Sequence, residues 1–124
     1  QPRMRNTCML AGSAKPEDVV KSVKKGIYVE DVANGEVHIG EGSFAFYVSM
    51  GHAIEDGKLG APIKDVNIMG NGPQMLADIT MVADDFMLSE YGTGSCGKAG
   101  QSVPAGFGQP TCLVKSLTVG GVKA

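Results

Sequence analysis

The sequence predicts an α+β domain made mostly of antiparallel β-strands, arranged as a sandwich or a barrel. Short apolar runs alternate with turn residues, and glycine supplies many of these turns, with 18 among 124 residues. Only two short segments, near residues 16–25 and 73–79, space their apolar residues as a helix does. An open sheet of this size would leave exposed strand edges, so we expect the strands to curl or stack.

The first helix is expected at residues 16–25. Pro16 lies at its start, acidic residues follow in the first turn, Lys24 and Lys25 fall in the last turn, and Gly26 stands where a C-terminal cap belongs. One apolar stripe follows helical spacing and comprises Val19, Val20, Val23 and Ile27. The segment is therefore predicted to be a short amphipathic helix.

Two tight turns organise the strands that follow. Asn34-Gly35 and Asp56-Gly57 are each flanked by apolar runs, and such dipeptides are strong signals for a two-residue hairpin turn. Between the turns, four apolar side chains alternate with other residues and are expected on one face of a strand: Phe44, Phe46, Val48 and Met50.

The second half is predicted to contain one more helix among short strands. A strand is expected at residues 62–70, and Pro73 opens a helix near residues 73–79, where Met75, Leu76 and Ile79 have helical spacing. Two further apolar runs, at residues 86–88 and 112–119, flank a glycine-rich segment.

Length and composition limit the possible functions. A chain of 124 residues and 12.9 kDa fits a single domain spanning residues 1–124. The net charge of −2 argues against direct nucleic-acid binding, because such domains usually have a basic face. The lysine cluster at residues 21–25 is expected to complement the dipole at the end of the first helix.

The chain shows no signal peptide, and its longest uncharged apolar stretch is too short to cross a bilayer. Its three cysteines have no regular spacing, which argues against a disulfide framework and favours a reducing cytoplasm. Because the chain begins with Gln1 rather than methionine, we expect it to be part of a longer protein.

The glycine-rich segment at residues 91–110 partly matches two phosphate-binding patterns. Gly92–Gly97 fits G-x-G-x-x-G, and Gly92–Lys98 fits the start of a P-loop. Both patterns require a helix immediately afterwards, which the glycines and prolines at residues 100–110 prevent. A P-loop also needs serine or threonine where Ala99 stands, so neither nucleotide-binding interpretation is favoured.

Within this segment, Cys96 has small neighbours and a nearby lysine. Backbone N–H groups and an ammonium group favour the thiolate form of a cysteine. The residues alone leave three interpretations open: a nucleophile, a metal ligand, or a small residue in a tight loop. Cysteine catalysis usually needs a histidine base, and His38 and His52 both lie on predicted strands, where we interpret them as ordinary strand residues.

Four blocks of the sequence resemble the C-terminal domain of the TldD/PmbA family, whose members were once called modulators of DNA gyrase. The blocks appear in the family's order and with consistent spacing along nearly the whole chain. They are MRNTCMLAG at residues 4–12, VKKGIYVED at 23–31, IEDGKLGAPIKDVNIMGNGPQML at 54–76, and GSCGKAGQSVPAGFGQPTCLVKSLTVGG at 94–121.

The resemblance implies a domain of a cytoplasmic zinc peptidase. In TldD-type members, an H-E-x-x-x-H helix in a preceding domain supplies two histidine ligands and a general base, and the cysteine of the glycine-rich loop is the third ligand. By this match Cys96 is the zinc ligand, and Gly94, Ser95, Gly97 and Lys98 form the loop around metal and substrate. A Cys/His/His set with an open fourth position is typical of catalytic zinc.

The resemblance also implies partners and alternatives. The expected partners are the missing N-terminal domain, a related TldE/PmbA-type subunit, and unfolded or leader-type peptides held in extended form. The alternatives are a non-catalytic TldE/PmbA-like subunit that builds the substrate chamber, or a regulator of DNA gyrase. Because the chain has no H-E-x-x-x-H, we expect it by itself to contain no catalytic residue, to bind zinc weakly at most, and to be inactive.

Overall fold

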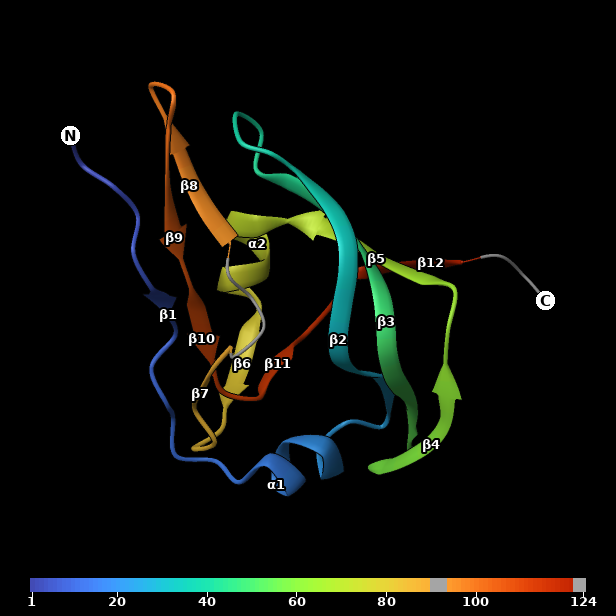
Figure 1. Ribbon diagram of the computed structural model, residues 1–124. Helices are drawn as coiled ribbons and strands as arrows, with labels where there is room; N and C mark the ends of the chain where they lie inside the picture. The colour runs from blue at the N-terminus through green and yellow to red at the C-terminus, as the bar shows by residue number, and fades with distance from the viewer. Residues whose placement is uncertain (90–93, 122–124) are drawn as a thin grey trace.

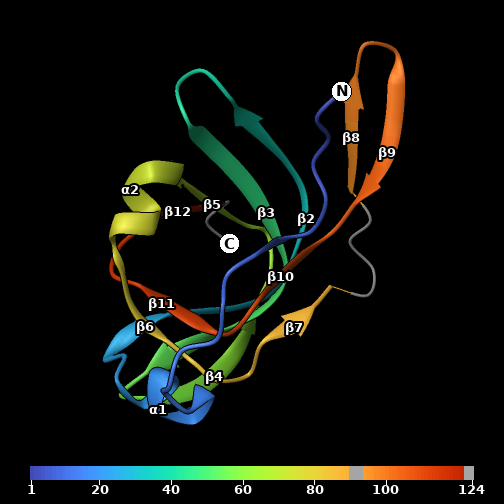
Figure 2. The same cartoon turned by 90° about the vertical axis from the view of Figure 1, so that its left-hand side faces the viewer.

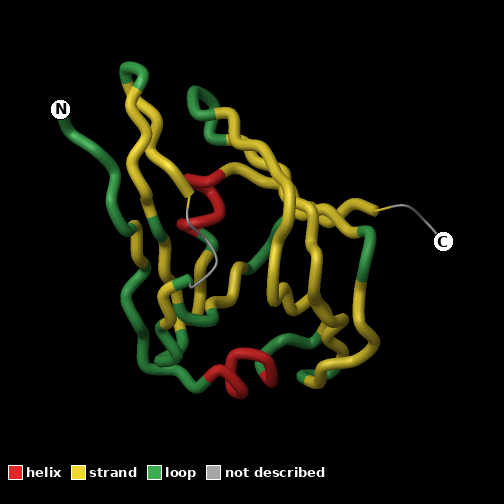
Figure 3. The backbone as a smooth tube through the Cα atoms, in the orientation of Figure 1, coloured by secondary structure: helices red, strands yellow, loops and turns green. Residues whose placement is uncertain are grey.

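The computed structural model describes residues 1–89 and 94–121, and it consists of strands with two short helices (Figure 1, Figure 3). The described strands form four separate sheets, and all strand pairs except one are antiparallel. This confirms the predicted α+β class with mostly antiparallel strands. The sheets do not close into a barrel.

The largest sheet has the strand order β12-β5-β3-β2, and β4 pairs with the free part of β3. Its long central strand pairs along one edge with β5 in its first half and with β4 in its second half. The strands are β2 (Lys25–His38), β3 (Ser43–Glu55), β4 (Lys58–Ile63), β5 (Val66–Asn71) and β12 (Thr118–Gly121).

Much of the buried core lies on β3. Phe44, Val48 and Ile54 are buried there, and Val48 is fully enclosed. The alternation predicted for this strand holds for Phe44 and Val48, but Met50 is exposed. The cause is a shift in the pairing register of β2 and β3 near Asp31 and Met50, which changes the face that the side chains take.

The hairpin predicted at Asn34-Gly35 is wrong. Both residues lie inside β2, next to a bulge, and the chain turns instead between β2 and β3, where Gly42 has a φ of 76°. A Cβ atom on Gly35 would lie 2.1 Å from Cδ1 of Phe46. The glycine therefore allows close pairing with β3 and does not form a turn. The turn predicted at Asp56-Gly57 is confirmed, with φ angles of 47° and 73°.

The helix α1 (Pro16–Lys21) is shorter than predicted. The amides of Asp56 and Gly57, in the β3–β4 turn, donate to the carbonyls of Lys24 and Val23. The turn thus forms hydrogen bonds with two carbonyls just beyond the helix. Gly26, predicted as the cap, lies in β2. The second helix, α2 (Gly72–Ala77), begins and ends slightly earlier than predicted, and Ile79 starts the next strand.

The strand predicted at residues 62–70 is divided in the structure. β4 ends at Ile63 and β5 begins at Val66, because Asp65 has a φ of 57° and redirects the chain. The chain therefore changes strands along the edge of β3 at this point.

The remaining strands lie on the other side of the molecule (Figure 1, Figure 2). β10 is the middle of a three-stranded sheet, parallel to β1 and antiparallel to β7. β6 pairs with β11, and β8 pairs with β9. The strands are β1 (Thr7–Cys8), β6 (Ile79–Val82), β7 (Met87–Leu88), β8 (Gly94–Lys98), β9 (Gln101–Ala105), β10 (Phe107–Gln109) and β11 (Cys112–Val114).

Candidate metal-ligand hairpin

The glycine-rich segment forms a β-hairpin between β8 and β9. Cys96 pairs with Val103 and Lys98 pairs with Gln101, and the hairpin projects toward the same end of the molecule as the tip of the β2–β3 hairpin (Figure 1, Figure 2). Ala99 and Gly100 form the turn with φ angles of 49° and 76°, as a two-residue turn with both central residues left-handed requires. No helix follows Gly97, although both phosphate-binding patterns require one there. Gly92 and Thr93, with which both patterns begin, lie outside the described residues.

The first residues of the chain lie along this hairpin. Arg3 donates through Nη2 to the carbonyl oxygens of Cys96 and Gln101, the second at 3.2 Å, and through Nη1 to Oε1 of Gln101, also at 3.2 Å. The side-chain amide of Gln1 donates to Oε1 of Gln101 at 3.0 Å. Lys98 donates from Nζ to the carbonyl oxygen of Pro2 at 3.5 Å. Segment 1–4 is thereby attached to both strands of the hairpin.

The Cys96 thiol is partly exposed and has contacts that favour its thiolate form. The backbone N–H of Met4 donates to Sγ at 3.5 Å. This hydrogen bond, followed by the interaction with the Arg3 guanidinium, lowers the pKa of the Cys96 thiol, while desolvation opposes the change. These contacts suit a sulfur that acts as a metal ligand or a nucleophile.

The other two cysteines differ from Cys96. Cys112 on β11 is half-buried, and burial, together with the nearby Asp85 carboxylate, raises the pKa of its thiol. Cys8 on β1 is exposed, and all three cysteines are free thiols. The surroundings of Cys96 thus stabilise a negatively charged sulfur, whereas those of Cys112 disfavour one.

The two histidines lie on strands, as predicted. His38 contacts the carboxylate of Glu36 and His52 contacts that of Glu30, both at 2.9 Å. Each pair belongs to the β2–β3 sheet. Within residues 1–89 and 94–121, no three His, Cys, Asp or Glu side chains cluster in a way that could hold a metal ion.

Cys96 fits zinc as a single contributed ligand. A thiolate is a preferred zinc ligand, and the hydrogen bond from Met4 orients the sulfur. The neighbouring Gly97 leaves open space, because a Cβ atom built there would meet nothing within 4 Å. The described residues can therefore supply one protein ligand to a metal shared with another part of a larger protein.

The residues predicted to surround the metal occupy the same strand. Gly94, Ser95, Gly97 and Lys98 all lie on β8 with Cys96 and are exposed. A Cβ atom on Gly94 would make only an ordinary contact, 3.6 Å from the carbonyl oxygen of Ala105. The described neighbours thus give no packing reason for glycine at positions 94 and 97.

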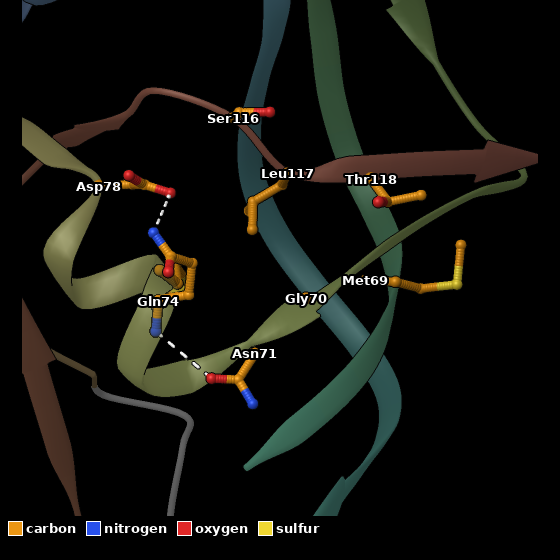
Figure 4. A pocket seen from close by; sticks show the side chains of 9 residues that line it. Met69, Gly70, Asn71, Gln74, Asp78, Ser116, Leu117 and Thr118 are labelled. Carbon is orange, nitrogen blue, oxygen red and sulfur yellow. Dashed lines mark hydrogen bonds between the residues drawn. The ribbon is translucent and has the colours of Figure 1, made fainter. Parts of the chain in front are cut away.

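A pocket of about 230 Å³ lies elsewhere, between α2, β5 and β12 (Figure 4). Asn71 caps α2 by accepting the N–H of Gln74, whose side chain in turn donates to Asp78 at 3.1 Å (Figure 4). The lining of this pocket contains one carboxylate, no cysteine and no histidine, and it includes no residue of the β8–β9 hairpin. This pocket therefore lacks a set of metal ligands.

The sequence analysis missed Arg3 and the Met4 amide. Both contact Cys96 across more than ninety positions of sequence, and a backbone N–H leaves no trace in residue types. The available signal was position: Arg3 directly precedes the block at residues 4–12 that carried the resemblance.

Comparison with known families identifies the chain as a metallopeptidase domain. Residues 1–121 match the family described as the PmbA/TldA metallopeptidase C-terminal domain. The chain belongs to this family, which confirms the resemblance seen in the four sequence blocks.

Curated relatives carry names that agree with this assignment. The "Metalloprotease TldD homolog" of Haemophilus influenzae is 46% identical over 120 residues, covering 97% of this chain and 25% of the relative. The "Zinc metalloprotease TldD homolog" of Saccharolobus solfataricus is 35% identical over 119 residues, covering 96% of this chain and 26% of the relative. The chain thus spans about a quarter of the length of these relatives.

Two solved structures share the fold. TldE from Thermococcus kodakarensis has a TM-score of 0.73 at 16% identity, covering 92% of this chain and 23% of that one. A Thermotoga maritima protein named as a modulator of a DNA gyrase has a TM-score of 0.72 at 21% identity, covering 93% of this chain and 24% of that one. Among the described residues, neither helix has the length and apolar character needed to span a membrane.

Proposed function

We propose that the chain is the cysteine-contributing, C-terminal domain of a cytoplasmic zinc metallopeptidase that cleaves unfolded or leader-type peptides. In this proposal Cys96 is one zinc ligand, and the other two are histidines of an H-E-x-x-x-H helix in the N-terminal domain of the full-length protein. A TldE/PmbA-type subunit is the second partner.

One observation carries the proposal: Cys96 lies on a projecting hairpin with a partly exposed sulfur that accepts the Met4 N–H. Such a thiol can reach a metal held by another domain. The names of the relatives agree, since they include metalloproteases and a zinc metalloprotease. Zinc in such a site supplies a Lewis acid that polarises a peptide carbonyl.

The hairpin also suits an extended peptide. β8 pairs only with β9 among the described strands, so its other edge presents main-chain donors and acceptors. A peptide that adds to such an edge is bound largely through its backbone, which gives little sequence preference. Gly94 and Gly97 keep this part of β8 free of bulky side chains. These features favour an unfolded peptide over a folded protein as substrate.

The test uses the full-length protein together with its TldE/PmbA-type partner. Zinc content and peptide hydrolysis are measured for the natural protein, for Cys96→Ala, and for the matched control Cys8→Ala. We expect Cys96→Ala to lower zinc content and hydrolysis together, since it removes a ligand. Cys8→Ala should retain both, because the exposed Cys8 lies on a different sheet.

Two results would overturn the proposal. If Cys96→Ala keeps zinc and full hydrolysis, Cys96 is not a ligand. If the full-length sequence lacks H-E-x-x-x-H and the complex depends on its partner for zinc, the chain belongs to the non-catalytic subunit. Salt-dependent DNA binding by the full-length protein would instead support a role in regulating DNA gyrase.

A further inference from the structure

Arg3 connects the two strands of the hairpin that carries Cys96. Its Nη2 group donates to the carbonyl oxygens of Cys96 on β8 and Gln101 on β9, and its Nη1 group donates to the side chain of Gln101. A guanidinium presents its donors in a rigid planar fork, so several bonds to one hairpin fix it in one orientation.

The described side-chain hydrogen bonds of Arg3 all go to the β8–β9 hairpin. Its Nε atom is buried and has no hydrogen-bond partner in the described part of the chain. The ion pairs found among the described residues do not include Arg3. No carboxylate among the described residues therefore forms an ion pair with the Arg3 guanidinium, which lies next to the backbone of Cys96.

The Arg3 side chain also places its neighbour. Because Arg3 is bound to the hairpin, the next residue, Met4, is held where its backbone N–H reaches Sγ of Cys96 at 3.5 Å. Lys98 and Gln1 attach the same segment at two more points, through the Pro2 carbonyl and the Gln101 side chain. The direction of the sulfur thus depends on a segment that contains no metal ligand of its own.

We propose that Arg3 is a positioning residue for the Cys96 ligand: by joining segment 1–4 to β8 and β9, it fixes the hairpin and the hydrogen bond that orients Sγ toward the metal. The inference rests on the proposed function, since it assigns Arg3 a role toward the same site. Groups that orient a metal ligand typically change metal affinity 10- to 100-fold when they are removed.

The test uses the metal-free full-length protein titrated with Co²⁺, whose bond to a thiolate gives a charge-transfer absorption. We expect Arg3→Gln to raise the dissociation constant for Co²⁺ roughly 10- to 100-fold and to weaken the charge-transfer band. Arg3→Lys keeps the charge but lacks the fork, so it should restore the band only in part. Arg5→Gln, in the same segment, should match the natural protein, because Arg5 is exposed.

Unchanged cobalt affinity and an unchanged band in Arg3→Gln would overturn the inference. Cys96→Ala separates the two proposals: if it also leaves the band intact, the assignment of Cys96 as a ligand fails. If Arg3→Gln does not fold, Gln101→Ala decides, because it removes the side-chain acceptor of Nη1 and leaves Arg3 in place. A weaker band in Gln101→Ala then supports the inference, and an unchanged band contradicts it.

Discussion

Asp85 binds Thr111 through both carboxylate oxygens: Oδ1 accepts the backbone N–H at 2.8 Å, and Oδ2 accepts the hydroxyl at 2.7 Å. Thr111 in turn accepts the N–H of Ala83 at 2.8 Å. These bonds join the segment between β6 and β7 to the segment between β10 and β11. Asp85 and Thr111 thus help to connect the β1-β10-β7 sheet to the β6-β11 sheet.

This pair predicts a loss of stability in acid. Desolvation acts to raise the pKa of Asp85, but the hydrogen bonds from Thr111 outweigh it, so the folded-state pKa lies below its ordinary value. A carboxyl group whose pKa is lowered by folding stabilises the folded state at pH values above its unfolded pKa of about 4. This stabilisation is lost as the pH falls. Because Asp85 is exposed, solvent screening keeps the contribution at about 1 kcal/mol or less.

Asp85→Asn should remove this acid dependence and lower the free energy of unfolding at neutral pH by that amount. Urea denaturation of the natural chain and the variant between pH 3 and pH 7 measures both effects. The two curves should converge toward the acid end. Parallel curves over the whole range would show that Asp85 does not contribute in this way.

The pairing of Gly35 with Phe46 predicts a costly substitution. Gly35→Ala would place Cβ 2.1 Å from Cδ1 of Phe46 and 2.7 Å from the carbonyl oxygen of Ala45. Relief of such overlap requires shifts of β2 or β3, and we expect a loss of about 1–3 kcal/mol in the free energy of unfolding. Gly40→Ala is the control, since its Cβ would meet nothing within 4 Å. Equal urea midpoints for the two variants would contradict the prediction.

The turn of the β8–β9 hairpin predicts a stabilising substitution. Ala99 has a φ of 49°, which alanine adopts at a cost and asparagine adopts more readily. Ala99→Asn should stabilise the hairpin by about 1 kcal/mol and slow amide hydrogen exchange on β8 and β9 severalfold. Ala99→Val, with a branched side chain at the same φ, should accelerate exchange. If both variants exchange at the natural rate, the turn does not limit hairpin opening.

Substitution of Gly97 is expected to slow peptide hydrolysis without changing the stability of the fold. Because a Cβ at this position meets nothing within 4 Å, Gly97→Ala should change the free energy of unfolding by less than about 0.5 kcal/mol. In the full-length complex, however, the added methyl group faces the proposed surroundings of metal and peptide, and we expect roughly tenfold slower hydrolysis. Full activity in Gly97→Ala would place the peptide away from this part of β8.

The chain by itself is predicted to bind zinc weakly and to hydrolyse no peptide. Cys96 is the candidate ligand it offers, and the described residues contain no cluster of three potential ligands. Titration with zinc against a chelating dye, followed by a peptide hydrolysis assay, tests this. Stoichiometric, tight zinc on the isolated chain would mean that a complete site forms without the histidines of another domain.

Local patterns predicted the fold class and one of the two hairpin turns, but they did not show which of two similar dipeptides forms a turn. Asp56-Gly57 and Asn34-Gly35 look alike in sequence, yet the first forms a turn and the second lies within a strand. The difference is made by Phe46, which approaches Gly35 from the neighbouring strand. Likewise, the Val23 carbonyl just beyond α1 accepts the amide of Gly57, a contact far along the chain that local spacing does not predict.

The candidate site shows the same limit. Small neighbours and a lysine singled out Cys96, and the resemblance supplied its expected role. The contacts from Arg3 and Met4 were not predictable, because each joins residues more than ninety positions apart and involves a backbone atom. Residue types and spacing identify candidate chemistry, whereas contacts distant in sequence determine how a side chain is oriented.

The parallel pair of β1 and β10 has a consequence for the order in which the molecule is assembled. Thr7 pairs with Phe107, so roughly 100 residues must be synthesised between the first strand and its partner. At typical translation rates of about 5–20 residues per second, β1 waits about 5–20 s on the ribosome before it can pair. Within this domain, segment 1–4 is therefore made well before the β8–β9 hairpin, and the hairpin that carries Cys96 acquires its support only once both of its strands have emerged.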